Sequence, residues 1–177
     1  RELAYSLVKQ NKKVAMVSLE DQMDVTAQAM VALDMNIPLN KFRFNPPAQS
    51  VVQPHFDEIV HSGNLFFWKH FGKMNLSNLM DKLYYYARSK SCDFIFLDHL
   101  SSVVAASKES NERQAIDHIM DELSQLVIET GVGLVMVVHL KRPGGDKSCA
   151  KGGEVELSDL RGSAALEQYS WAVVGLE

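Results

Sequence analysis

FIFLDH, residues 94–99, is the stretch from which the fold of this 177-residue chain can be worked out. Four consecutive apolar residues end in the carboxylate of Asp98. A short apolar run bounded by polar residues is typical of a strand buried on both faces of a parallel sheet. Ligands of open parallel sheets bind beyond the carboxyl ends of the strands. We therefore expect Asp98 at a functional edge, although a buried strand followed by a turn-capping Asp explains this stretch equally well.

The same pattern occurs twice more along the chain. VAMVSLE, residues 14–20, ends in Glu20, and GLVMVVH, residues 133–139, ends in His139. The carboxyl ends of parallel strands meet at one edge of a sheet. We therefore expect Glu20, Asp98 and His139 to share that edge.

Strand patterns alternate with helical patterns over the whole chain. Helices are expected at 1–12, 21–35, 77–90 (with Ser77 as N-cap), 111–130 and 158–169. Strands are expected at 14–20, 65–68, 94–98, 134–139 and 171–176. Residues 38–63 are expected to be irregular, with room for a short helix near 56–61, and residues 101–110 to form a loop. This alternation predicts βαβ units and an α/β fold with a parallel sheet.

Composition limits the class of protein. The hydrophobic fraction is 46%, the charged fraction 23% and the net charge −4, which is ordinary for one soluble domain with a core and gives no global attraction to nucleic acid. No apolar run approaches the roughly 20 residues needed to cross a bilayer. Cys92 and Cys149 lie outside any metal-ligand spacing, so neither a disulfide framework nor a zinc site is expected.

Each of the three strand-end residues has a functional and a structural interpretation. Glu20 suits a base that orients and deprotonates water, or a carboxylate that stabilises a helix N-terminus. Asp98 matches the end of a Walker B strand, whose carboxylate holds the water shell of Mg²⁺ beside a nucleotide γ-phosphate. Alternatively, Asp98 and His99 are metal ligands of a hydrolase. His139 suits a phosphate contact or a structural hydrogen bond.

A long polar segment, residues 141–156, follows the strand that ends in His139. Long loops without a secondary-structure signal are usually functional or disordered. Within residues 140–151 four positive charges face only one negative charge, that of Asp146. A flexible basic loop suits a phosphate backbone, and a solvated surface loop is the alternative. The basic residues are Lys141, Arg142, Lys147 and Lys151.

Several nucleotide and hydrolase motifs are missing from these 177 residues. A P-loop requires Gly, four residues and Gly-Lys-Ser/Thr, but Gly72-Lys73 is followed by Met74, with Phe67 in place of the first Gly. Neither a G-x-G-x-x-G turn nor a G-x-S-x-G elbow is present. The chain opens inside a helical pattern and closes on a strand pattern, so we expect an internal piece of a longer protein.

Four motifs carry a family resemblance that covers essentially the whole chain: VSLED, CDFIFLDHLSSVV, ETGVGLVMVVHLKRP and LSDLRGSAALEQYSWAVVGLE. With these motifs in this order, the chain resembles the RecA-like motor domain of ring-shaped replicative DNA helicases, of the phage helicase-primase type in the DnaB-like superfamily. The resemblance implies one RecA-like domain over residues 1–177, with three α/β/α layers around a mostly parallel sheet.

The resemblance also implies roles for residues. Glu20 matches the catalytic glutamate that activates water, Asp98 the Walker B aspartate that binds Mg²⁺ through water, and His139 the γ-phosphate sensor. Arg161 and Gln168 fall in the last motif, which connects the DNA loop to the nucleotide site. The family's central-channel loop, which binds single-stranded DNA, matches Lys141, Arg142, Lys147 and Lys151.

The resemblance finally implies a cytoplasmic hexameric helicase, in the host cytoplasm if phage-encoded, with no membrane partner. Its substrate would be ATP or dTTP with Mg²⁺, and it would translocate on single-stranded DNA. The phosphate-binding loop is expected before Arg1, and the arginine finger after Glu177. One alternative is another RecA-like ATPase, such as a recombinase or regulatory ring, against which LRGSAALEQ argues. The other is a domain that binds single-stranded DNA or a partner without nucleotide.

Overall fold

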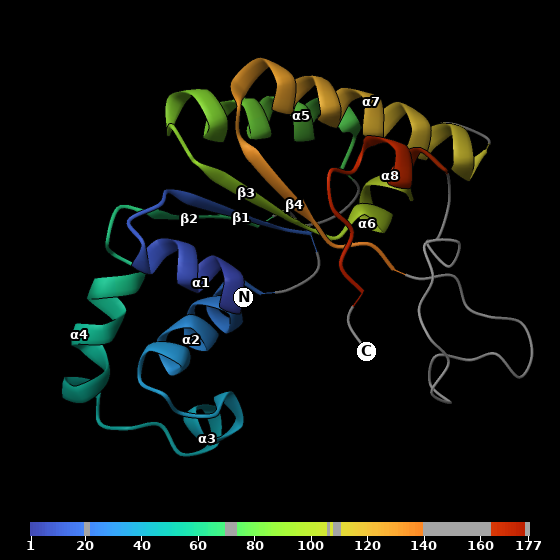
Figure 1. The fold of residues 1–177 in the computed structure, drawn as a ribbon. Coiled ribbons are helices and arrows are strands. Elements are labelled where there is room, and N and C mark those ends of the chain that lie inside the picture. Colours follow the sequence, from blue (N-terminus) through green and yellow to red (C-terminus); the bar gives the residue numbers. More distant parts are fainter. Residues whose placement is uncertain (20–21, 70–73, 106, 108–110, 140–163, 176–177) are drawn as a thin grey trace, which may run out of the picture.

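The computed structural model describes residues 1–19, 22–69, 74–105, 107, 111–139 and 164–175. Its centre is a four-stranded sheet in the order β2-β1-β3-β4, in which all neighbouring strands are parallel (Figure 1). The strands are β1 (Val14–Ser18), β2 (Leu65–Lys69), β3 (Phe94–Asp98) and β4 (Gly133–Met136).

Helices cover both faces of the sheet (Figure 1). One face carries α5 (Leu76–Tyr84), the π-helical turn η1 (Tyr85–Ser89), α6 (Leu100–Val104), α7 (Glu112–Thr130) and α8 (Ala164–Tyr169). The other face carries α1 (Glu2–Lys9), α2 (Met23–Asp34), α3 (Leu39–Phe44) and α4 (Gln49–Ile59). These three layers and the parallel sheet confirm the predicted α/β/α fold.

The central strand β3 has core on both of its faces, which explains its continuous apolar run. Ile95 and Leu97 are fully buried in the cluster beneath α5 and α7, whereas Phe96 belongs to the cluster beneath α1. Successive side chains of a strand point to opposite faces, so both sides of β3 must be apolar. Complete burial of one such side chain contributes about 1.5–3 kcal/mol.

Side-chain caps begin α5 and α7, the helices beneath which this core lies. Asn111 accepts a hydrogen bond from the Arg113 N–H at 2.9 Å and caps α7, which ends at Gly131 with φ 70°. Asn75 caps α5 by accepting from the Asn78 N–H at 2.8 Å. The predicted cap, Ser77, is wrong, because it already lies inside the helix.

The prediction of an irregular segment at residues 38–63 is wrong. It contains α3 and α4, although Pro54 lies inside α4. A proline in a helix removes a backbone donor and disfavours the preceding turn. Here α4 is held by tertiary packing, because Val52 and Phe56 pack against Phe42 of α3 and the cluster around α2.

Two further expectations also differ from the structure. The loop predicted at residues 101–110 includes most of α6, which forms because Leu100 and Val103 are both buried beneath it. The strand predicted at 171–176 is not formed over residues 171–175, where Trp171 is 99% exposed. The predicted helix at 158–169 is present from Ala164, and its first part lies outside the described residues.

Among the described helices, none is long and apolar enough to cross a membrane.

Candidate active site

The carboxyl ends of β1, β3 and β4 meet at one edge of the sheet. Ser18 and Asp98 are register partners on β1 and β3. Backbone hydrogen bonds continue beyond the strands: the Leu19 N–H donates to the Asp98 carbonyl at 2.7 Å, and the Val137 N–H to the Leu97 carbonyl at 3.0 Å. The residues that follow the three strands are therefore held side by side, as the sequence pattern predicts.

Two of the predicted residues, Asp98 and His139, lie at this edge. Asp98 is half-buried at the end of β3, and His139 is exposed three residues beyond β4. His99 lies between them, because its ring packs edge-to-face on that of His139, with centroids 4.4 Å apart and planes at 66°. The peptide bond between Asp98 and His99 is cis. Among the described residues, this edge therefore carries the carboxylate of Asp98 and the imidazoles of His99 and His139.

Of the remaining predicted site residues, the structure describes Gln168, together with the residue that precedes Glu20. Leu19, which precedes Glu20, is hydrogen-bonded to Asp98. Gln168 is exposed on α8, which is fixed to α7 by a 3.4 Å hydrogen bond from the Tyr169 hydroxyl to Asp121. The predicted residues that lie outside the described part of the chain are Glu20, Lys141, Arg142, Lys147, Lys151 and Arg161.

A small pocket of about 60 Å³ opens at the same edge and is lined in part by Arg1, Ser18, Thr26, Asp98 and Val137. Arg1 precedes the first turn of α1, and its carbonyl accepts the Tyr5 N–H at 2.9 Å. The N–H groups of a helix N-terminus favour a phosphate. Ser18 and Thr26, both buried, add polar groups that were not singled out from the sequence. The sequence signal for Arg1 was its position at the start of the helix before the first strand.

The donor set at this edge fits Mg²⁺ better than a closed metal centre. In the described part of the chain, no three His, Cys, Asp or Glu residues form a metal-binding group. Mg²⁺ at nucleotide sites uses one or two carboxylates, with water and phosphate oxygens completing the octahedron. Asp98 alone meets that need, whereas a catalytic zinc site needs three protein ligands. The Asp98–His99 metal-hydrolase interpretation therefore finds no third ligand among the described residues.

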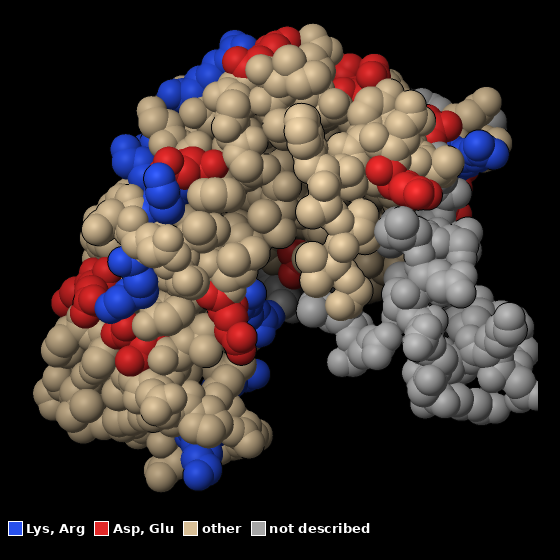
Figure 2. Space-filling model, in the orientation of Figure 1, with Lys and Arg blue, Asp and Glu red and all other residues tan. Residues whose placement is uncertain are grey.

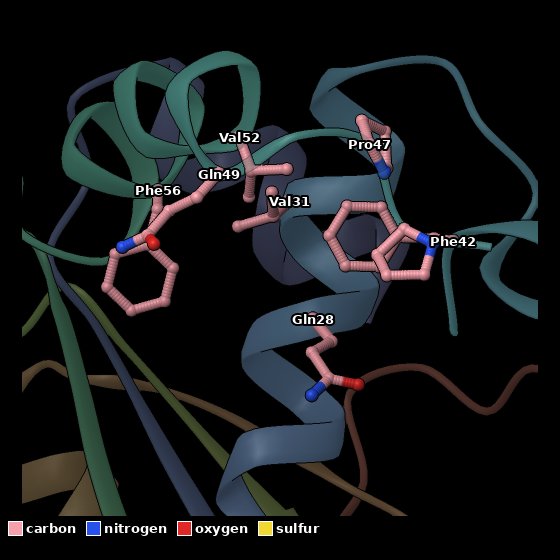
Figure 3. A pocket seen from close by; sticks show the side chains of 8 residues that line it. Gln28, Val31, Phe42, Pro47, Gln49, Val52 and Phe56 are labelled. Carbon is pink, nitrogen blue, oxygen red and sulfur yellow. The ribbon is translucent and has the colours of Figure 1, made fainter. Parts of the chain in front are cut away.

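A larger pocket, of about 380 Å³, lies between α2, α3 and α4 (Figure 3). The rings of Phe42 and Phe56 border it, with Val31 and Val52 between them, and Gln28 and Gln49 supply amide groups. None of the described residues that line it is ionisable. They therefore offer no group for acid–base chemistry, which places the candidate active site at the strand ends instead.

Comparison with known proteins identifies the family of the chain. The family described as "DnaB-like helicase C terminal domain" matches residues 1–176. A DNA helicase/primase of Enterobacteria phage T3 is 35% identical over 169 residues, which are 94% of this chain and 30% of that relative. The chain thus spans less than a third of the length of this relative.

Solved structures share the fold. One, described as an ATPase domain, matches with a TM-score of 0.75 at 18% identity, over 94% of this chain and 60% of that one. A DnaB-like replicative helicase, described with its interactions with primase, matches with a TM-score of 0.75 at 19% identity, over 94% of this chain and 40% of that one. A KaiC-like protein from Pyrococcus horikoshii has a TM-score of 0.52 at 14% identity, over 91% of this chain and 60% of that one.

Proposed function

This chain belongs to the DnaB-like helicase C-terminal domain family, and from that premise we propose that it is the NTP-hydrolysing motor core of a hexameric replicative DNA helicase. In this proposal, hydrolysis of ATP or dTTP drives translocation on single-stranded DNA and unwinding of the duplex. The proposed domain covers residues 1–177, and a phosphate-binding loop before Arg1 and an arginine finger after Glu177 complete the site.

The observation that carries the proposal is the meeting of three strand ends at one edge. Asp98 and His139 are both there, and Leu19, next to Glu20, is hydrogen-bonded to Asp98. A motor site needs a base for water, a metal-binding carboxylate and a group that contacts the γ-phosphate. The three proposed residues supply one of each.

Each proposed residue has one task. Glu20 takes a proton from the attacking water, and Asp98 holds the water shell of the metal. Bound Mg²⁺ neutralises part of the charge of the phosphates. The imidazole of His139 donates a hydrogen bond to the γ-phosphate. Arg161 and Gln168 are proposed to connect this site to the DNA-binding loop.

His139 also joins the site to the basic segment. It directly precedes residues 140–151, and its ring packs on His99, next to Asp98. A shift of His139 on phosphate loss therefore moves the start of that segment. We propose that Lys141, Arg142, Lys147 and Lys151 bind the phosphate backbone of single-stranded DNA, so that this shift becomes translocation.

The test is a Glu20→Gln substitution in the full-length protein, with hydrolysis measured with and without single-stranded DNA. A general base contributes roughly 10²–10⁴-fold, so we expect a loss of that size with DNA binding retained. The control is Glu122→Gln, which changes an exposed glutamate of α7 beside His118. Hydrolysis within a few-fold of wild type in Glu20→Gln would show that Glu20 is not the base.

Strand displacement on a forked duplex separates a helicase from a recombinase or regulatory ring of the same fold. We expect the full-length protein to release the displaced strand only with a hydrolysable nucleotide. Hydrolysis without strand release would favour the other two functions.

A further inference from the structure

The π-helical turn η1 lies at the end of the sheet opposite to Asp98. It follows α5 and leads into the amino end of β3, and its wide turn is closed by the Lys90 N–H donating to the Tyr85 carbonyl at 3.1 Å. Turns of this kind are rare and frequently occur at functional sites. Tyr84, Tyr85 and Tyr86 occupy the junction between α5 and η1, so aromatic rings gather there.

Two of these rings form a supported pair. Tyr86 is buried, and its hydroxyl donates to the Phe67 carbonyl at 3.3 Å. Tyr85 packs on it with centroids 5.5 Å apart and planes at 65°, and it remains 43% exposed. The exposed ring is thus held in place by a buried neighbour, which reduces the entropy lost when a ligand stacks on it.

Two lysines lie beside the exposed ring. The Lys82 and Lys90 ammonium groups are each 5.7 Å from the centroid of Tyr85. The Lys90 ammonium also lies 5.6 Å from the centroid of Phe66. All three distances are close to the ~6 Å limit of a cation–π contact, so these contacts hold the ammonium groups weakly and leave them able to bind an anion. Neither has a carboxylate partner among the described residues. Figure 2 shows Lys and Arg atoms, with Asp and Glu atoms among them, along the upper left of this view.

The neighbouring aromatic–cation pair is already occupied. Arg88 lies 4.7 Å from the centroid of Tyr84, and both side chains bind Glu129, at 2.8 Å and 3.0 Å. The available groups are therefore the Tyr85 ring and two ammonium groups. We call Tyr85, Lys82 and Lys90 the tyrosine–lysine platform.

We propose that the tyrosine–lysine platform is a second binding surface for single-stranded nucleic acid, separate from the basic segment 140–151. A base stacks on the Tyr85 ring, and adjacent phosphates bind Lys82 and Lys90. An acidic peptide would use the ammonium groups and leave the ring without a role. The five residues of β3 separate the platform from Asp98 by roughly 15 Å at about 3.3 Å per residue, so no single nucleotide contacts both.

The test uses the full-length protein with all four basic residues of the segment 140–151 replaced by Ala, so that this segment no longer dominates the binding of single-stranded nucleic acid. These residues are Lys141, Arg142, Lys147 and Lys151. Anisotropy of a labelled oligothymidine is measured without nucleotide. In this background, Tyr85→Ala should weaken the remaining binding roughly 5- to 150-fold, the usual range for one stacked base, and Tyr85→Phe should retain it. Replacing Lys82 and Lys90 by Ala should reduce the slope of log K against log salt by about 1.4.

Matched controls come from α3 at the other end of the molecule. Phe44→Ala removes a 92% exposed ring, and the pair Lys41→Ala with Arg43→Ala removes two exposed cations. Neither should change binding. Equal unfolding midpoints by circular dichroism verify that all variants fold.

A forked duplex identifies the source of the strand. Photoreactive 4-thiothymidine is placed either in the tracked strand or in the displaced strand, and the strand that crosslinks to η1 is the one bound at the platform. The proposal is overturned if no binding remains in the loop-substituted background, or if Tyr85→Ala binds as well as Tyr85→Phe. In the second case, competition by polyglutamate would identify the surface as one for an acidic protein. Because no hydrolysis is measured, the result does not depend on the role of Glu20.

Discussion

At the scale of single residues, burial decides which groups are available for chemistry. Cys92 is 5% exposed and lies in the main core cluster, and burial raises the pKa of its thiol to about 11. The thiolate is the reactive form of cysteine, and very little of it exists at pH 8 when the pKa is that high. Cys92 is therefore a core residue rather than a reactive or redox-active one.

We expect Cys92 to resist alkylation by iodoacetamide at pH 8 in the folded protein and to react when urea unfolds it. Its labelling rate should thus report the opening of the core beneath α5. Mass spectrometry of the tryptic peptide containing Cys92 measures the rate at rising urea concentration. Fast labelling without urea would contradict this expectation.

At the scale of elements, a buried carboxylate joins three of the four helices on one face of the sheet. Asp34 of α2 is 6% exposed in its side chain and accepts hydrogen bonds from Tyr5 at 2.9 Å and Lys9 at 3.1 Å, both on α1. It also bonds His55 of α4 at 2.5 Å. Lys9 additionally pairs with Glu58, so α1 and α4 are tied to each other as well.

This cluster predicts a loss of stability in acid. Burial alone would raise the pKa of Asp34, but the hydrogen bonds from His55, Tyr5 and Lys9 outweigh it and hold the pKa below its usual range. A carboxyl group whose pKa is lower in the folded state stabilises the fold above its unfolded pKa, about 3.9, and loses that effect as pH falls through the folded value.

We expect Asp34→Asn to reduce the free energy of unfolding by about 2 kcal/mol at pH 7, the usual size for a hydrogen bond to a charged group. The difference from wild type should be smaller at pH 3, below the unfolded pKa of about 3.9, because Asp34 takes up a proton there in the unfolded chain. Urea unfolding at both pH values measures it, with Asp81→Asn, at an exposed position of α5, as the control. An equal difference at both pH values would mean that the Asp34 charge does not contribute.

The elements that were predicted correctly from the sequence are those whose apolar residues follow a pattern set by their burial in the core. All four described strands were predicted, because apolar runs such as residues 94–97 are buried from both faces. The helices α3, α4 and α6 were missed or shortened, because their stability comes from contacts across the fold. Leu100 and Val103, three residues apart and both buried, were the available signal for α6. The π-helical turn η1 had no signal that periodicity could detect.

At the scale of the whole molecule, the sequence predicted which strands deliver polar residues to a common edge, and it did not predict their surroundings. Asp98 and His139 both lie there, as expected from parallel strands, and His139 packs on His99, the neighbour of Asp98. Strand order and the backbone bonds between β1, β3 and β4 bring the ring of His99 onto that of His139. They also bring Arg1, Ser18 and Thr26 together in the lining of the pocket. These relations exist only in three dimensions, so periodicity along one chain does not contain them.

The end of the sheet gives a last prediction for the 177-residue chain in solution. The strand order places β4 at the end of the sheet, and in the described part of the chain no strand pairs with its outer side. Three exposed apolar side chains come after β4 or after α8: Val137 is 46% exposed, Trp171 99% and Val174 80%. An open strand edge and exposed apolar side chains each favour association with another chain. We therefore expect concentration-dependent self-association of this chain.

Sedimentation velocity from about 1 to 100 μM measures this association, a range in which weak contacts become populated. Trp171→Ser together with Val174→Ser should shift the chain toward monomer, because each removes exposed apolar surface at no cost to the core. Phe44→Ser, which removes a ring that is 92% exposed on α3, should leave the association unchanged. If the doubly substituted chain associates as strongly as the original one, the exposed side chains of Trp171 and Val174 do not contribute to the contact between molecules.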